Sequence, residues 1–239
     1  MELTVLGKYG PFPKVGGATS SYLLKVDGKV ILIDCGAGSV SRLLKHARIE
    51  DVDVIIISHF HFDHSSDLGV LIYKYQNLYA NGFLKRPIVY CPDGGGAMAE
   101  SVINCPYFDV TTVCGGELTF LDGIDFEFFP MNHPVLTVGV KISNGKKVFS
   151  YTGDTNLTPC LEDLFENADL VVADGAFLKA DWTENKPHLS VEHIVELTKK
   201  YGNKSIISHI NPNYDEKILI ETIGDENCLI AEEGVSYKI

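Results

Sequence analysis

Four side chains that could bind a metal ion fall within six residues of this chain. They belong to the run Ser58-His59-Phe60-His61-Phe62-Asp63-His64, which follows the apolar stretch 54–57. Neutral imidazole is a common metal ligand, and a neighbouring carboxylate suits a divalent cation. His59 and His61 stand two residues apart, so in an extended chain they point the same way. Asp63 and His64 follow in a turn and can face a neighbouring point. The spacing therefore indicates two adjacent metal ions.

Three more residues of ligand type stand just past apolar runs that are typical of buried strands. They are His133, Asp154 and His209. Each of them taken alone is a common polar residue at a strand end or in a turn. Loops that leave the end of a strand also carry much of the chemistry of enzymes. Their order after the histidine cluster makes all three candidate metal ligands.

In this order the seven residues resemble the pattern of the metallo-β-lactamase-fold hydrolases. That pattern is His-x-His-x-Asp-His, then a later His, a Gly-Asp after a strand, and a last His. The resemblance spans almost the whole chain. It implies an α/β fold, a four-layer αββα sandwich with the site at one edge. It also implies that residues 1–239 form a single hydrolase domain.

The resemblance further implies how the ligands are shared between two divalent ions. One ion would take His59, His61 and His133, the second would take Asp63, His64 and His209, and Asp154 would bridge the two. A bridging carboxylate offsets the repulsion between dications that lie about 3.5–4 Å apart. A metal-bridging hydroxide would be the nucleophile, and Asp63 would orient it or take its proton. The nitrogen-rich ligand set favours Zn²⁺, with Mn²⁺ or iron as alternatives.

A second motif bears on the reaction. The run Asp174-Gly175-Ala176-Phe177, followed by His188-Leu189-Ser190, is similar to a paired motif of tRNase Z and related phosphodiesterases. By that resemblance His188 is the general acid or phosphate clamp, and Asp174 is its partner. A protonated imidazole can donate its proton to a leaving alkoxide, and a neighbouring carboxylate favours that protonated form. The family usually carries Glu where Asp174 stands.

The expected function is therefore that of a dinuclear metal-dependent phosphodiesterase acting on small phosphodiesters, such as a cyclic nucleotide or a short oligonucleotide. Transfer RNA is not an expected partner, because the chain lacks the long basic arm with which tRNase Z grips it. The net charge of −12 also disfavours a broad surface for polyanions. The alternative is a lactonase or thioesterase-like carboxylic-ester hydrolase, for which His188 would be idle. A non-enzymatic sensor is disfavoured because all seven ligands are present.

The chain has no apolar stretch approaching the roughly 20 residues that span a membrane. Its first residues lack a basic segment followed by a long apolar stretch, so they read as a strand and not as a signal peptide. A cytoplasmic location without membrane contact is therefore expected. The resemblance adds the expectation of a homodimer.

Strands and helices that would position these residues alternate along the chain. We expect strands near 2–7, 20–26, 29–34, 53–57, 88–91, 109–113, 117–121, 124–130, 137–143, 146–151, 170–173 and 205–207. We expect helices near 39–46, 67–79, 159–166, 190–201 and 213–222, the fourth capped by Ser190. Two packed sheets with helices on their outer faces follow. Asp27-Gly28 predicts a hairpin, and residues 94–96 predict a strand-to-helix turn. Loop 7–20 is expected to rim the site. Lys8 or Lys14 could contact a phosphate there, but a solvated surface position is the expectation for both.

Overall fold

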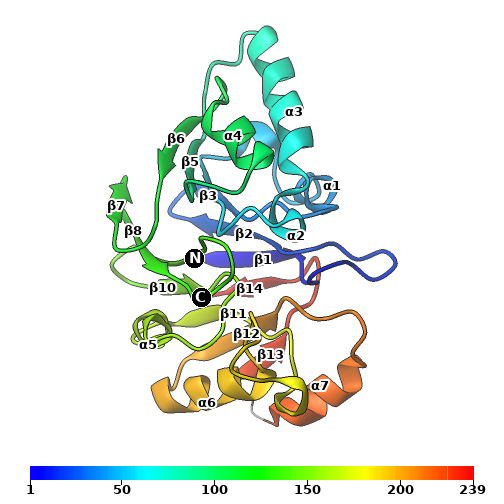
Figure 1. Cartoon of the computed structure of the whole chain (residues 1–239). Coiled ribbons are helices and arrows are strands. Elements are labelled where there is room, and N and C mark those ends of the chain that lie inside the picture. Colours follow the sequence, from blue (N-terminus) through cyan, green and yellow to red (C-terminus); the bar gives the residue numbers. More distant parts are fainter. Residues whose placement is uncertain (225) are drawn as a thin grey trace.

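Two mixed sheets pack face to face at the centre of the molecule (Figure 1). The computed structural model describes residues 1–224 and 226–239, and within them each sheet has seven strands. In spatial order the first sheet contains β14 (Ser236–Lys238), β1 (Glu2–Gly7), β2 (Ser21–Val26), β3 (Lys29–Ile33), β4 (Val54–Ile56), β5 (Ile88–Cys91) and β6 (Asp109–Thr112). The second contains β13 (Cys228–Ile230), β12 (Lys204–Ser208), β11 (Leu170–Asp174), β10 (Val148–Tyr151), β9 (Val138–Ser143), β8 (Ile124–Pro130) and β7 (Leu118–Leu121).

Helices cover the outer face of each sheet, which gives four layers (Figure 1). On the first sheet lie α1 (Ser39–Leu43), α2 (Phe62–Ser65), α3 (Leu68–Ala80) and α4 (Ala97–Ile103). On the second lie α5 (Cys160–Phe165), α6 (Val191–Tyr201) and α7 (Glu216–Ile223). Two 3₁₀ turns, η1 (Ile49–Asp51) and η2 (Lys179–Asp181), complete the described elements. The predicted αββα sandwich is confirmed.

Alternate residues of a strand belong to two different parts of the hydrophobic core. In β3, Ile31 and Ile33 belong to the cluster between the sheets, whereas Leu32 packs with the helices of the first layer. Successive side chains of a strand point to opposite faces, so a strand covered on both sides is apolar throughout. That is why the sequence 29–33 reads as a continuous apolar run after its first residue.

Local signals explain several boundaries. Asp27 and Gly28 have φ values of 46° and 82°, the left-handed conformation that a tight hairpin between β2 and β3 requires. Ser190 caps α6 as predicted, accepting a hydrogen bond from the His193 amide while the His193 ring accepts one from the Ser190 amide. Two short strands, β13 and β14, were not predicted.

The order of the strands brings the candidate residues to one edge. Strands β3, β4 and β5 run parallel, and so do β10, β11 and β12. Strand β9 is antiparallel to both β8 and β10, so β8 ends at the same edge as β10. Ligands bind in α/β sheets at the carboxyl ends of the strands. The seven candidate ligands and Asp174 follow or close strands at this edge, and His188 lies in the segment between η2 and α6.

Candidate metal centre

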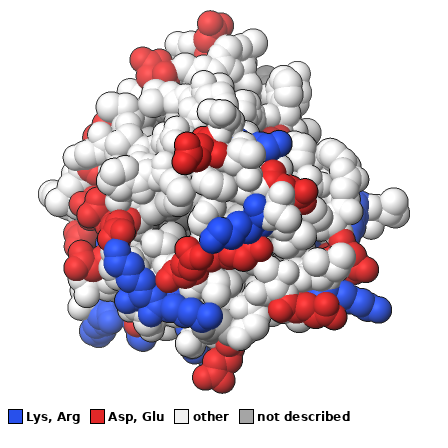
Figure 2. Space-filling view, turned by 60° about the horizontal axis from the view of Figure 1, so that its bottom comes forward, with Lys and Arg blue, Asp and Glu red and all other residues white. Residues whose placement is uncertain are grey.

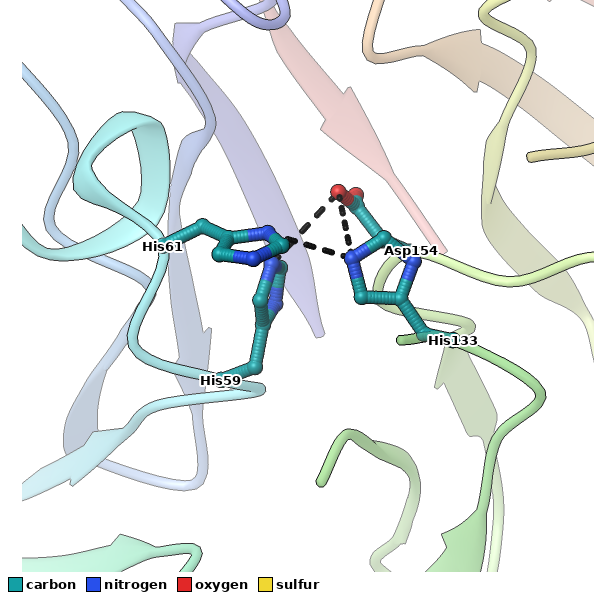
Figure 3. A group of neighbouring side chains, drawn as sticks. All are labelled: His59, His61, His133 and Asp154. Atoms are coloured by element: carbon teal, nitrogen blue, oxygen red, sulfur yellow. Dashed lines mark hydrogen bonds and ion pairs between the residues drawn. The ribbon is translucent and has the colours of Figure 1, made fainter. Parts of the chain in front are cut away.

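One group of candidate ligands is formed by three histidines and an aspartate that converge from separate loops. They are His59, His61, His133 and Asp154 (Figure 3). Their ligand atoms all lie within 4.8 Å of one another. His61 Nδ1 and His133 Nε2 are 3.1 Å apart, and His59 Nε2 lies 3.5 Å from Asp154 Oδ2. The loops after β4, β8 and β10 supply these side chains, so residues 95 positions apart in the chain meet at one point.

A second group shares the same aspartate. Asp63, His64 and His209 surround Asp154, again with ligand atoms within 4.8 Å of one another. His64 Nε2 lies 3.1 Å from Asp154 Oδ1, and His209 Nε2 lies 3.3 Å from Asp154 Oδ2. The two oxygens of Asp154 therefore face ligands of both groups. The structure thus brings together all seven residues that the sequence indicated.

Unsatisfied polar atoms test whether these residues suit metal ions. His59 Nε2, His64 Nε2 and Asp154 Oδ1 are buried and make no hydrogen bond of acceptable geometry among the described residues, although His64 Nε2 and Asp154 Oδ1 lie 3.1 Å apart. Buried polar atoms without a partner are rare and call for an explanation. Each of the three atoms faces the centre of the cluster, and each is a donor atom for a divalent cation. The residues therefore fit metal binding, which would satisfy all three atoms at once.

Asp34 supports His64 on the side of the ring that faces away from the other ligands, and it was not among the residues that the sequence indicated. Its side chain is fully buried, and its Oδ2 lies 2.7 Å from His64 Nδ1. Ser58 donates to both Asp34 oxygens, and Tyr151 donates to Oδ2 at 2.6 Å. A carboxylate on the second imidazole nitrogen fixes the ring and raises its basicity as a ligand. The only sequence signal was an Asp that closes the apolar strand 29–33.

Burial and neighbouring charges set the protonation of the site. Burial holds the pKa of His59 well below the usual imidazole range, and burial also lowers the pKa of His133. Burial opposes charge on Asp154 too, but the imidazoles of His209 and His64 outweigh it and keep its pKa well below the usual carboxyl range. The arrangement is thus a buried anion ringed by imidazoles, of which His59 and His133 are neutral and can donate a lone pair to a cation.

His188 and Asp174 lie beside the second group. His188 Nδ1 is 2.7 Å from Asp174 Oδ2, and the His188 ring stacks on that of His209 with centroids 4.7 Å apart. Burial disfavours the charged imidazole of His188, but the carboxylates of Asp174 and Asp154 prevail and raise its pKa to about 9. The His188 side chain is 15 % exposed, against 4 % for His209. The predicted pair is therefore in contact, at the open side of the cluster.

The loop after β1 closes one side of the centre, as predicted for a rim. The backbone of Gly10 packs closely against the imidazole of His209, since an added Cβ would lie 2.0 Å from His209 Nε2. The Gly10 amide donates to the Ile210 carbonyl, which ties the loop to the residue after His209. The prediction of a solvated Lys8 is wrong. Its side chain is 8 % exposed and pairs with Glu216 at 3.0 Å, so it anchors the loop to the start of α7.

Comparison with known proteins gives consistent matches. Residues 29–210 match the family described as the Beta-lactamase superfamily domain. A protein of Bacillus subtilis named Probable metallo-hydrolase YhfI is 26% identical over 224 residues, covering 88% of this chain and 87% of that protein. Ribonuclease Z of Mycolicibacterium gilvum is 27% identical over 247 residues, covering 89% of this chain and 85% of the relative.

Solved structures share the fold. The crystal structure of YhfI from Bacillus subtilis superposes with a TM-score of 0.91 at 23% identity, covering 99% of this chain and 98% of that one. A diphosphatase from the PhnP family gives a TM-score of 0.78 at 18% identity, covering 100% of this chain and 97% of that one. At this level of identity the match establishes the architecture. Within the described residues, no helix is both long and apolar enough to cross a membrane.

Proposed function

This chain belongs to the beta-lactamase superfamily of metal-dependent hydrolases, and we propose that it is a dinuclear phosphodiesterase acting on small phosphodiesters. The contact between His188 and Asp174 carries the proposal. Hydrolysis of an alkyl phosphodiester expels a poor leaving group, which needs a proton as it departs. An imidazole held by a carboxylate at the open side of a metal cluster is suited to that step. The name of one relative, Ribonuclease Z, supports phosphodiester hydrolysis, and that of a structural neighbour, a diphosphatase, supports hydrolysis at phosphorus.

Asp174 keeps His188 ready to donate. Asp174 Oδ2 engages His188 Nδ1 at 2.7 Å and also accepts the Thr155 amide at 3.0 Å. Its Oδ1 accepts the Ala176 amide at 3.2 Å, so the carboxylate is fixed on both oxygens. With Nδ1 engaged, the proton that His188 can give to a leaving oxygen is the one on Nε2. The shorter side chain at position 174, compared with the Glu of related enzymes, does reach the imidazole.

The seven clustered residues would hold the metals. His59, His61 and His133 would bind one ion, Asp63, His64 and His209 the other, and Asp154 both. When bound, two divalent ions supply a water nucleophile of lowered pKa and neutralise charge on the phosphoryl oxygens. Asp63 is well placed to orient that water, because its Oδ2 lies 3.1 Å from His209 Nε2 and its side chain is 9 % exposed. Zinc suits the nitrogen-rich set.

Small substrates are favoured by the charge on the surface. Figure 2 shows Lys and Arg side chains interleaved with Asp and Glu on the face over α6 and α7. Lys179 pairs there with Glu196 at 3.1 Å, and Lys200 pairs with Glu162. Basic groups paired in this way do not form a continuous track for a polyanion. The metal centre is therefore proposed to gain its affinity from one phosphodiester and its immediate substituents.

The test compares two leaving groups. Zinc-loaded protein is assayed on bis(p-nitrophenyl) phosphate and on a dinucleoside monophosphate, with His188→Ala beside wild type. We expect kcat/KM on the dinucleoside monophosphate to fall by about 10²–10⁴-fold in the variant, the contribution typical of a general acid. The fall on bis(p-nitrophenyl) phosphate should be much smaller, because p-nitrophenolate leaves without a proton.

The matched control is His46→Ala, a histidine in the turn after α1 and outside the metal cluster. It should retain wild-type rates on both substrates. A wild-type protein that holds two metals per chain, cleaves a lactone and cleaves neither phosphodiester would overturn the proposal. Equal losses on both substrates in His188→Ala would remove the general-acid role from His188.

A further inference from the structure

A cavity opens beside the first group of candidate ligands. It has a volume of about 410 Å³ and uses His61 as one wall. The rest of its lining is Phe60, Gly94, Gly95, Val135 and Leu136. These come from the loops after β4, β5 and β8, the same edge that carries the metal ligands. Cavities of about 300–1,000 Å³ lined by apolar groups with a few polar ones are typical of small-molecule sites.

The lining carries no charge apart from what His61 can contribute. Phe60, Val135 and Leu136 present hydrocarbon, and the two glycines present backbone. Leu136 is 43 % exposed although it is a large apolar residue, whereas Phe60 is 7 % exposed. A second phosphate or a carboxylate would lose its hydration here without gaining a cationic partner, which is costly. The cavity therefore favours an uncharged, apolar group.

A glycine turn gives the cavity its shape. Gly94, Gly95 and Gly96 have φ values of 119°, 122° and 72°, in the region that side chains with a Cβ rarely adopt. An added Cβ at Gly95 would lie 2.5 Å from Phe60 Cβ and 3.0 Å from the Phe60 ring. The backbone of Gly95 is thus pressed against Phe60, whereas a Cβ on Gly94 would meet nothing within 4 Å. The glycine turn therefore borders the cavity next to the packed ring of Phe60.

We propose that this cavity is a substrate subsite for a flat, uncharged ring attached to the scissile phosphodiester, such as an aryl group or a nucleobase. The inference rests on the proposed phosphodiesterase function, which places the phosphate on the metal centre. His61 lies in the first metal group and also lines the cavity, so a substituent on a phosphate at the metals is within reach of the cavity. Specificity then follows from the apolar surface that the ring buries.

The experiment measures binding, at a temperature and on a timescale at which neither ligand is detectably hydrolysed. Zinc-loaded protein is titrated calorimetrically with diphenyl phosphate and with dimethyl phosphate, two monoanions that share the same phosphodiester group. We expect diphenyl phosphate to bind about 10-fold or more tightly, the gain typical of burying one aromatic ring. In Leu136→Asp this preference should fall to about 2-fold or less, because a carboxylate at the cavity disfavours the ring.

Two further variants make the test specific. Leu84→Asp places the same charge at another exposed leucine, 67 % exposed in the loop before β5, and should keep the wild-type ratio. Leu136→Met keeps an apolar side chain of similar volume and should also keep it. Equal affinities for the two ligands in wild type, or an unchanged ratio in Leu136→Asp, would overturn the subsite. Tight binding of diphenyl phosphate without turnover of any phosphodiester would leave the subsite standing and defeat the proposed function.

Discussion

Asp34 supports the metal centre without being one of its candidate ligands. It is fully buried and receives hydrogen bonds from Ser58 and Tyr151 while it holds the ring of His64. We predict that Asp34→Asn weakens zinc binding by about 10–100-fold, the usual effect of losing a carboxylate behind a metal-binding imidazole. Asn accepts the positive φ of 55° at this position, so the backbone can keep its course. Competition with a chelator of known affinity measures the change.

The control for this substitution is Asp122→Asn. Asp122 also has a positive φ, 48°, but its side chain is 66 % exposed and pairs with Lys29 on the surface. The pair lies outside the groups of candidate ligands, so zinc affinity should not change. Wild-type zinc affinity in Asp34→Asn would show that His64 is oriented without the carboxylate.

Residue type and order made most of the site visible in the sequence. Three imidazoles and a carboxylate between His59 and His64 have no explanation in packing, which is why they stood out. Asp34 gave no such signal, since one Asp at a strand end is common in turns. Its importance comes from its burial and from Tyr151, which lies 117 positions away in the chain. Contacts over that distance depend on how the two sheets pack.

At the scale of elements, the close approach of loop 8–20 to His209 leads to a second prediction. Gly10→Ala would push a methyl group into the imidazole, since the added Cβ would lie 2.0 Å from Nε2. The loop cannot easily withdraw, because the Gly10 amide donates to the Ile210 carbonyl and the Ile210 amide donates to the Lys8 carbonyl. We predict that zinc content, measured by elemental analysis, falls from two ions per chain to about one, with the ion bound by His209 lost.

Gly69→Ala is the matched control, since it makes the same chemical change in helix α3. A Cβ there meets nothing within 4 Å, and alanine is the better helix former. It should keep two zinc ions and raise stability by about 0.5 kcal/mol, a rise in melting temperature of about 1–2 °C. Two zinc ions in Gly10→Ala would mean that the loop or the imidazole moves aside at little cost.

Local signals predicted the elements well where a turn or a cap fixes them. The β2–β3 hairpin follows from Asp27-Gly28, and the start of α6 from Ser190. Strands β13 and β14 were missed because each has only three residues, too few to establish a period of two. They exist because a neighbour supplies hydrogen bonds: β12 pairs with β13, and β1 pairs with β14. A strand defined by its partner has little signal of its own.

At the scale of the whole molecule, the four layers were predictable because strands and helices alternate in each half of the chain. The way in which the two sheets pack together was not predictable, since no local feature of the sequence specifies which apolar face of one sheet contacts which face of the other. The expected homodimer stays a prediction, which sedimentation velocity would test. The surface charge, in contrast, can be read from both sequence and structure, and it bears on the length of the substrate.

The last prediction concerns salt. The chain has a net charge of −12, and basic side chains such as Lys147 and Lys179 are engaged by carboxylates at 2.7 and 3.1 Å. Cations held in such pairs are less available to contact phosphates beyond the one at the metals. Each phosphate contact on a single strand adds about −0.7 to the slope of log affinity against log salt. We predict a slope no steeper than about −1 for kcat/KM on a single-stranded oligonucleotide, between about 50 and 200 mM salt.

Length provides the control for the same measurement. A dinucleoside monophosphate and a longer single strand should give similar slopes and similar kcat/KM per cleavable bond, since the additional phosphates meet no basic track. A slope steeper than about −3, seen only with the longer strand, would require about four phosphate contacts. That result would mean that the surface binds nucleic acid along several phosphates, despite the pairing of its lysines. The proposed substrate class would then change from small phosphodiesters to long chains.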